Sequence, residues 1–250
     1  MTRTTSAFSP IVPASMTGRR VAWGFTTRNG GVSCPPFDSL NLGLKTMDDP
    51  DAVRENHHRL YSFAGVKHEN AADMGQVHGD VVRVADCGGS YPETDGLVTA
   101  TSGLLLGVRT ADCVPLLLFD PERRVAAAVH CGWRSITAGI AGKTLRLMRE
   151  RYGSDAAAVA AAIGPAAGPC CYEVGPEVAG LLDSSSVVGH DGVLHADLKN
   201  ELRIRLLGAG LASGAIETVP GCTICAPDLF FSHRRDGDRS GRQMGFIVLR

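Results

Sequence analysis

The sequence predicts an α+β (mixed α/β) fold, and three observations lead to this prediction. Apolar runs of strand length recur along the chain, and segments with helical spacing lie between them. The strand runs are almost continuously apolar, which is typical of sheets covered on both faces. No Pro/Ser-rich linker or repeat divides the 250 residues, so residues 1–250 are expected to form a single domain.

The first helix is predicted over residues 49–65. A capping aspartate, a proline in the first turn and a final glycine mark its ends. Its apolar face is expected to carry Val53, Leu60 and Phe63. His57 and His58 are expected to face solvent.

The remaining elements are predicted from the same signals. One helix should run from Trp133 to Gly153, another over about 197–207, and a short one from Pro176. Strands are expected at 81–86, 104–110, 114–120, 125–130 and 244–250.

Charge and composition narrow the class of partner and the compartment. The formal net charge is −1, which gives no general attraction to nucleic acid or to anionic membranes, so a small partner is expected. Residues 1–20 lack the apolar core of a signal peptide, and no run is long enough to span a bilayer. The eight cysteines are scattered along the chain, so we expect reduced thiols and a cytoplasmic protein.

A hairpin brings two chemically active residues together. The sequence DPERR joins two strands, and with Pro121 and Glu122 at the centre of the turn Cys113 would lie directly opposite His130. Directly opposed residues share a face and have Cβ atoms about 4.5–5.5 Å apart. That separation suits a shared metal ion or a thiolate–imidazole pair.

His78, in the sequence GQVHGD, is a candidate third member of this group. Two imidazoles and one thiolate are ligands that zinc accepts, and three ligands leave a fourth position open for water or substrate. Taken one by one, the cysteine and the histidines are as readily explained as core or structural residues.

At this point the sequence resembles a known family. The motifs that carry the resemblance are TTRNGGVS, QVHGD, TDGLVT, RTADCVPLLLFD, VHCGWRS, IGPAAGPCCYEVG and FFSHRRDGDRSGR, which run through nearly the whole chain. The family was once described as multicopper polyphenol oxidase (laccase) domain proteins and is now described as purine nucleoside phosphorylases. The resemblance implies a single-domain, layered sandwich of mixed β-sheets flanked by helices.

The resemblance also implies a function and a metal site. By motif, the zinc ligands would be His78, Cys113 and His130, the three residues that the hairpin and GQVHGD indicate. The implied activity is phosphorolysis of adenosine, inosine and methylthioadenosine, together with deamination of adenosine by a zinc-activated water. Purine nucleosides and phosphate are then the partners, and we expect a monomer.

The remaining site residues are predicted from motif membership and chemistry. Asp95 and Asp112 are the motif acids nearest the ligands and are candidates for catalytic proton transfer. Arginine side chains suit phosphate oxygens. The candidates for binding substrate or phosphate are Arg28, Gln76, Arg109, Ser232 and Arg234.

Two positions depart from the family pattern. Cys131 stands where alanine is usual, and because it follows a ligand in a strand its side chain is expected to point to the opposite face. Ala166 stands where cysteine is usual, so a thiol at that position is not required here. Cys222 and Cys225, and equally Cys34, Cys87, Cys170 and Cys171, are interpreted as structural or incidental.

Three other functions remain open at the level of the sequence. A copper-dependent polyphenol oxidase would need more imidazoles than this chain offers, although copper could replace zinc by metal exchange. A metal-free hydrolase or deamidase would use Cys113 as nucleophile and His130 as base, and would leave His78 without a task. Four closed ligands would favour a partner-binding module with a structural zinc, and Cys222 and Cys225 could offer two more thiolates.

Overall fold

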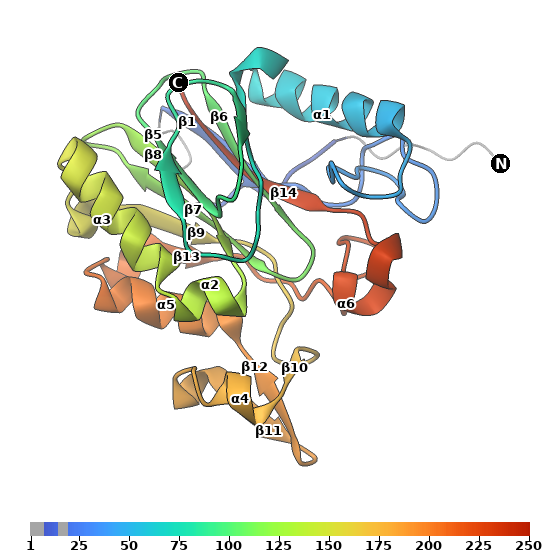
Figure 1. The fold of residues 1–250 in the computed structure, drawn as a ribbon, viewed down its shortest axis with the longest axis vertical. Coiled ribbons are helices and arrows are strands. Elements are labelled where there is room, and N and C mark those ends of the chain that lie inside the picture. Colours follow the sequence, from blue (N-terminus) through green and yellow to red (C-terminus); the bar gives the residue numbers. More distant parts are fainter. Residues whose placement is uncertain (1–7, 15–19) are drawn as a thin grey trace.

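The computed structural model describes residues 8–14 and 20–250. The expectation that residues 1–20 contain no signal peptide falls partly outside these ranges. Two large β-sheets lie face to face, with helices on both outer sides and a small third sheet beside them (Figure 1). Within the described ranges, no helix is long and apolar enough to cross a bilayer.

The first large sheet has the strand order β1-β14-β6-β2-β4. Strands β1, β14 and β6 are antiparallel neighbours, whereas β2 runs parallel to both β6 and β4. The strands are β1 (Val21–Phe25), β2 (Ala71–Met74), β4 (Gly89–Tyr91), β6 (Leu105–Thr110) and β14 (Gln243–Leu249).

The second large sheet has the order β13-β9-β7-β8-β5-β3. Its centre is the antiparallel hairpin β7–β8, and parallel pairs close both edges. The strands are β3 (Val82–Val84), β5 (Gly96–Thr99), β7 (Val114–Asp120), β8 (Val125–Cys131), β9 (Ala160–Ile163) and β13 (Ile216–Thr218).

Three apolar clusters define the layers. One lies between the two sheets, where Trp23 and Phe25 of the first sheet meet an alanine-rich face of the second. Another joins the outer face of the second sheet to α2 (Trp133–Thr137), α3 (Ile140–Tyr152) and α5 (Leu198–Gly208). The third packs α1 (Pro50–Ala64) on the outer face of the first sheet. The chain is therefore a four-layer sandwich, which confirms the predicted fold class.

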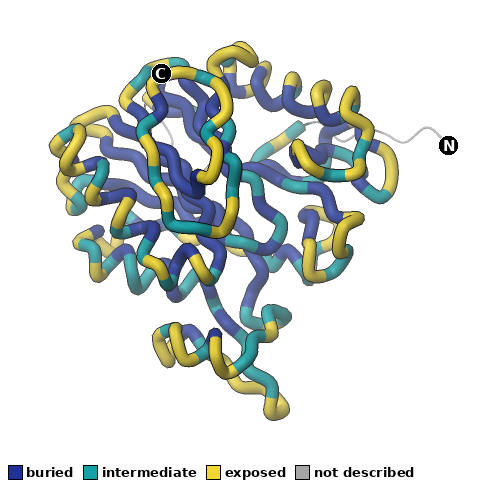
Figure 2. The backbone as a smooth tube through the Cα atoms, viewed as in Figure 1, coloured by how far each residue is buried: buried dark blue, intermediate teal, exposed yellow. Residues whose placement is uncertain are grey.

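The third sheet, ordered β10-β12-β11, projects from this body together with α4. Figure 2 shows that its outer tip is exposed, in contrast to the buried strands of the sandwich. Its elements are β10 (Glu173–Val174), α4 (Pro176–Ala179), β11 (Val187–His190) and β12 (Val193–Ala196). The remaining elements are α6 (His233–Asp236) and short 3-10 turns at 68–70, 156–158, 184–186, 213–215 and 237–239.

Helix α1 has the predicted ends, since the Asp49 side chain caps its first turn and Gly65 closes it in the left-handed conformation. The prediction that His57 faces solvent is wrong, since His57 is buried and its ring contacts the Tyr61 hydroxyl and the Leu42 carbonyl. A buried imidazole needs such partners, and the carbonyl comes from a loop that the helix pattern does not reveal. Phe63 is 48% exposed, and its ring contacts the buried ring of Phe246.

The helix predicted from Trp133 to Gly153 is two helices. Gly139, with φ 81°, ends α2 and starts α3 in the left-handed region that favours glycine. The helices predicted near residue 197 and from Pro176 are confirmed as α5 and α4.

The predicted register of the β7–β8 hairpin is wrong by two residues. Four residues, 121–124, form the turn, so His130 pairs with Pro115 and not with Cys113. The Asp120 carboxylate accepts the N–H groups of Glu122 and Arg123 and stabilises this longer turn. Since side chains alternate with a period of two, the shift leaves Cys113 and His130 on the same face, diagonally placed.

Candidate metal centre and cavity

His78, Cys113 and His130 come together at one end of the sandwich. One ligand atom from each residue lies within 4.8 Å of the other two, and the two imidazole rings have centroids 4.7 Å apart. The donor set and its spacing fit a zinc ion. The structure thus brings together the three residues that the sequence singled out.

Each ligand comes from a different kind of backbone position. His130 is the penultimate residue of β8, whereas Cys113 directly precedes β7 and follows Asp112, whose φ is 90°. His78 itself has a φ of 59° and lies in the loop that leads from β2 in the first sheet to β3 in the second. Positive φ is costly for residues other than glycine and is common at functional sites.

Asp95 holds two of the three ligands. Its buried carboxylate accepts the Nδ1 proton of His130 at 2.8 Å and the backbone N–H groups of Val77, His78 and Gly79. A carboxylate on Nδ1 fixes the ring and leaves Nε2 available to a metal. Burial alone would raise the pKa of Asp95, but the hydrogen bond from His130 and those from the backbone lower it.

The centre favours a thiolate even without a metal. Burial opposes ionisation of Cys113, yet the charge of His130 and hydrogen bonds from His130 and His78 outweigh it and lower the pKa of the thiol to about 6. Burial also opposes protonation of His130, but the Cys113 thiolate and Asp95 raise its pKa to about 9. The thiolate is the form that binds metals and acts as a nucleophile.

Cys131 points away from this group, as predicted. It is fully buried in the cluster between the second sheet and its helices. Burial, followed by the charges of Cys113 and Asp95, raises its pKa well above the ordinary value. It is therefore a core residue.

A cavity of about 580 Å³ opens beside the three candidate ligands. Its wall includes three cationic side chains, Lys45, Arg109 and Arg242. Arg109 is among the residues predicted from the sequence, whereas Lys45 and Arg242 are not. Arg242 belongs to the motif FFSHRRDGDRSGR and could have been found there, but Lys45 carries no signal in the sequence.

Gln76 and Arg109 line the cavity and are bonded to each other. The Gln76 side-chain amide donates to the Arg109 carbonyl at 2.8 Å and accepts the Arg109 backbone N–H at 3.0 Å. These are the two hydrogen bonds that the backbone of a neighbouring strand would make. The Arg109 guanidinium pairs with Asp73 at 2.5 Å and donates to the Met74 carbonyl. Both side chains are thus held in fixed positions at the cavity wall.

The other predicted site residues make structural contacts. Arg28 bonds to Asp38 and the Pro227 carbonyl and lies over the Phe231 ring, and it is not part of the cavity wall. Ser232 is buried and caps α6 through the Arg235 N–H.

Asp112 and Arg234 are bonded to each other near the ligands. The Asp112 carboxylate accepts the Thr223 hydroxyl and the backbone N–H of Arg234, each at 2.6 Å. The Arg234 guanidinium lies over the Tyr172 ring. Asp95 and Asp112, the two predicted proton-transfer groups, therefore both have their oxygens occupied by protein donors.

The fold and the candidate centre place the chain in a known family. Residues 22–250 match the family model described as multi-copper polyphenol oxidoreductase laccase, and the chain belongs to that family. It is 37% identical to the purine nucleoside phosphorylase YlmD of Geobacillus stearothermophilus, covering 90% of this chain and 88% of the relative. A purine nucleoside phosphorylase of Deinococcus radiodurans is 40% identical, covering 92% and 89%.

Solved structures agree with this assignment. The crystal structure of YlmD from Geobacillus stearothermophilus is similar, with a TM-score of 0.91 at 34% identity, over 100% of this chain and 98% of that one. A hypothetical protein YfiH of Bacillus licheniformis has a TM-score of 0.87 at 35% identity, over 92% and 93%. The family predicted from the sequence motifs is confirmed.

Proposed function

We propose that this protein is a zinc-dependent purine nucleoside phosphorylase acting on adenosine, inosine and methylthioadenosine, with adenosine deaminase activity as a second reaction. The observation that carries the proposal is the three-ligand cluster at the wall of a cavity with cationic side chains. The names of the relatives support the phosphorylase reaction. A volume of about 580 Å³ falls in the range of small-molecule sites.

Phosphorolysis needs an anion site next to a nucleoside site. The glycosidic bond breaks through a transition state with cationic character on the sugar, while phosphate attacks and the purine leaves. We assign phosphate binding to Lys45 and Arg242. Among the described residues Lys45 has no bonded partner, and Arg242 uses its Nη1 on the carbonyls of Ser240 and Gly241.

The other predicted residues take supporting roles in this proposal. Arg109 forms an ion pair with Asp73 in the wall, and Gln76 holds the backbone of Arg109 in place. Asp95 orients His130 and Asp112 anchors the backbone at Arg234, so we assign both as positioning residues. Arg28 and Ser232 stabilise the loops behind the cavity.

His78, Cys113 and His130 are the residues that would hold zinc. A bound zinc would supply a Lewis acid at this end of the cavity. Copper(II) binds most nitrogen and sulfur sites more tightly than zinc. We therefore expect copper to displace zinc when the purified protein is loaded with it, and we attribute any oxidase activity to that exchange.

Product analysis tests the proposal. Zinc-loaded protein is incubated with adenosine, with and without phosphate, and the products are separated by chromatography. Phosphate-dependent adenine and ribose 1-phosphate support phosphorolysis, and inosine supports deamination. The absence of all three products would refute the function.

Two variants test the anion site. Lys45→Ala and Arg242→Ala are each expected to raise the KM for phosphate at least ~10-fold, since each removes a charge that contacts an anion. Lys67→Ala is the matched control, because Lys67 is exposed and pairs with Glu69 outside this cavity. Unchanged phosphate KM in both cavity variants would contradict the assignment.

A further inference from the structure

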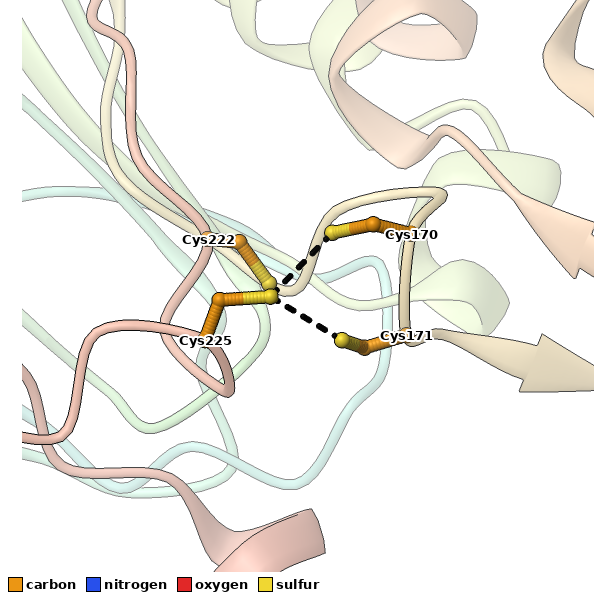
Figure 3. Close-up of side chains that lie close together, drawn as sticks. All are labelled: Cys170, Cys171, Cys222 and Cys225. Carbon is orange, nitrogen blue, oxygen red and sulfur yellow. Dashed lines mark hydrogen bonds between the residues drawn. The ribbon is translucent and has the colours of Figure 1, made fainter.

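Four cysteines from two distant parts of the chain meet beside the sandwich. Cys170 and Cys171 lie on the turn between β9 and β10, and Cys222 and Cys225 lie on the turn after β13 (Figure 3). The four Sγ atoms all lie within 4.8 Å of one another. None belongs to the candidate zinc centre described above.

The spacing of the sulfur atoms suits a tetrathiolate site. Cys225 Sγ is 3.4 Å from Cys170 Sγ and 3.1 Å from Cys171 Sγ. A tetrahedral zinc with Zn–S bonds of about 2.3 Å requires sulfur atoms about 3.8 Å apart, so small side-chain rotations convert one arrangement into the other.

The backbone already holds the two turns together. Cys222 forms a parallel bridge with Ala166, and the Gly168 N–H donates to the Cys222 Sγ at 3.3 Å. A backbone N–H bond to sulfur stabilises the thiolate form, which is the metal ligand. The spacing of Cys222 and Cys225 is the C-x₂-C spacing of zinc sites.

A positive charge lies next to the cluster. The Lys199 ammonium donates to the carbonyls of Val219 and Gly221, the residue directly before Cys222. Four thiolates around a divalent ion leave an excess of negative charge, which this ammonium would offset.

We propose that Cys170, Cys171, Cys222 and Cys225 form a second zinc site. Four protein ligands leave no open position, so its role is structural. Binding would release protons from the thiols that are still protonated in the metal-free protein.

The site would act on the catalytic region through direct contacts. Thr223, between the two cysteines of the C-x₂-C pair, donates its hydroxyl proton to Asp112, the residue before Cys113. On the other turn, Tyr172 follows Cys171 and lies under the Arg234 guanidinium. A zinc that fixes both turns would therefore hold Asp112 and Arg234 in place.

Metal analysis in a background without the first centre tests this proposal independently of the proposed function. The background variant carries His78→Ala and Cys113→Ala and is purified under reducing conditions, equilibrated with Zn²⁺ and passed through gel filtration. It is expected to retain about one zinc per chain. Adding Cys222→Ser and Cys225→Ser should abolish this zinc, whereas adding Cys34→Ser and Cys87→Ser, at exposed cysteines outside the cluster, should not.

Cobalt provides a spectroscopic measurement of the same site. Co²⁺ added to the His78→Ala, Cys113→Ala background is expected to give strong thiolate-to-metal absorption. This absorption should disappear when Cys170→Ser and Cys225→Ser are added to that background. The proposal is overturned if zinc content is the same with and without the four thiols. It is also overturned if the freshly purified protein contains a disulfide among these cysteines, seen as a mass deficit, and takes up no second zinc after reduction.

Discussion

Asp95 is the residue on which the geometry of the candidate zinc centre depends most. A single buried carboxylate fixes the His130 ring and also the backbone of the loop that carries His78. It determines which nitrogen of His130 faces the cavity, because Nδ1 is engaged. We therefore expect replacement of Asp95 to weaken metal binding more than it destabilises the fold.

Asp95→Asn tests this role. The amide keeps the volume but cannot accept hydrogen bonds on both groups, so zinc affinity is expected to fall about 10–100-fold. Chelator competition measures the affinity, and Asp86→Asn, at an exposed aspartate, is the control. Equal affinities in wild type and Asp95→Asn would contradict a positioning role.

Cys113 offers a test that separates a zinc ligand from a nucleophile. Its pKa of about 6 lies below the ordinary value of 9.0, so in the metal-free protein the thiolate is present above pH 6 and is lost as the pH falls through 6. Iodoacetamide labelling of Cys113, followed by peptide mass spectrometry, should therefore show a midpoint near pH 6.

Zinc is expected to protect Cys113 from this labelling until a chelator is added. Cys34, which is exposed and lies outside the candidate zinc centre and the four-cysteine cluster, provides the reference rate in the same sample. Rapid labelling of Cys113 in zinc-loaded protein would favour the metal-free Cys/His mechanism instead.

The sequence predicted the grouping of His78, Cys113 and His130 better than it predicted the cavity wall. The three residues belong to motifs with distinctive chemistry, and strand parity relates Cys113 to His130 even though the register shifted. Lys45 and Arg242 reach the cavity from segments almost 200 residues apart. No local sequence pattern indicates that two such distant segments line one cavity. Arg28 also lies in a family motif, yet it has structural partners, so motif membership does not distinguish it from the arginines at the cavity.

At the scale of elements, the junction between β8 and α2 brings the backbone close to the centre. Gly132 has an ordinary extended conformation, with φ −75° and ψ 166°, so any residue can adopt its backbone angles. A Cβ atom there would lie 3.1 Å from a ring carbon of His78 and 3.3 Å from the Cys113 Sγ. An alanine at this position would therefore require the side chains of His78 and Cys113 to move by a few tenths of an ångström.

Gly132→Ala is expected to displace two ligands and to lower zinc affinity at least ~10-fold, with little change in the unfolding midpoint of the metal-free protein. Isothermal titration with Zn²⁺ and thermal unfolding give the two readouts. Gly142→Ala within α3 is the control, since a Cβ there meets nothing within 4 Å. If Gly132→Ala bound zinc as tightly as the wild type, the side chains of His78 and Cys113 would be able to move aside without loss of affinity, and the prediction would be wrong.

Two predictions at this scale are wrong, each for its own reason. The helix after Trp133 is predicted as one piece because apolar spacing continues across Gly139, and an isolated glycine is compatible with a helix interior. The hairpin turn is predicted two residues too short because Pro121 and Glu122 are taken as its centre, whereas the Asp120 carboxylate accepts the N–H groups of Glu122 and Arg123 in a turn of four residues. Helix ends with a capping side chain, as at Asp49, were predictable because the signal is local.

For the whole molecule, the apolar layer between the sheets is one of three buried clusters that stabilise the fold. Leu117 of β7 is fully buried in this layer. Leu117→Ala is expected to lower the free energy of unfolding by about 2–5 kcal/mol, because it removes buried methyl groups and leaves a cavity.

Urea denaturation of the metal-free protein measures this effect. Leu181→Ala, at a leucine that is 53% exposed, is the control and is expected to change stability by less than about 0.5 kcal/mol. A loss below about 1 kcal/mol for Leu117→Ala would mean that the layer closes around the missing side chain.

The sandwich class was predictable from continuous apolar strands, but the order of the strands was not. Neighbours such as β1 and β14 are separated by more than 200 residues, and nothing in either strand specifies its partner. The same applies to the four cysteines, since the turns at 170 and 222 are joined by pairing outside regular strands. Their individual positions suggested incidental thiols, and only the fold reveals the cluster.

The loop from β2 to β3 crosses from one sheet to the other and is attached to both. Gln76 ties it to β6, and Asp95 binds the N–H groups of Val77, His78 and Gly79. Because a metal would bind the same loop through His78, the hydrogen–deuterium exchange of these three amides should slow on zinc binding. The amides of Val77, His78 and Gly79 would then report occupancy of the centre without any substrate being present.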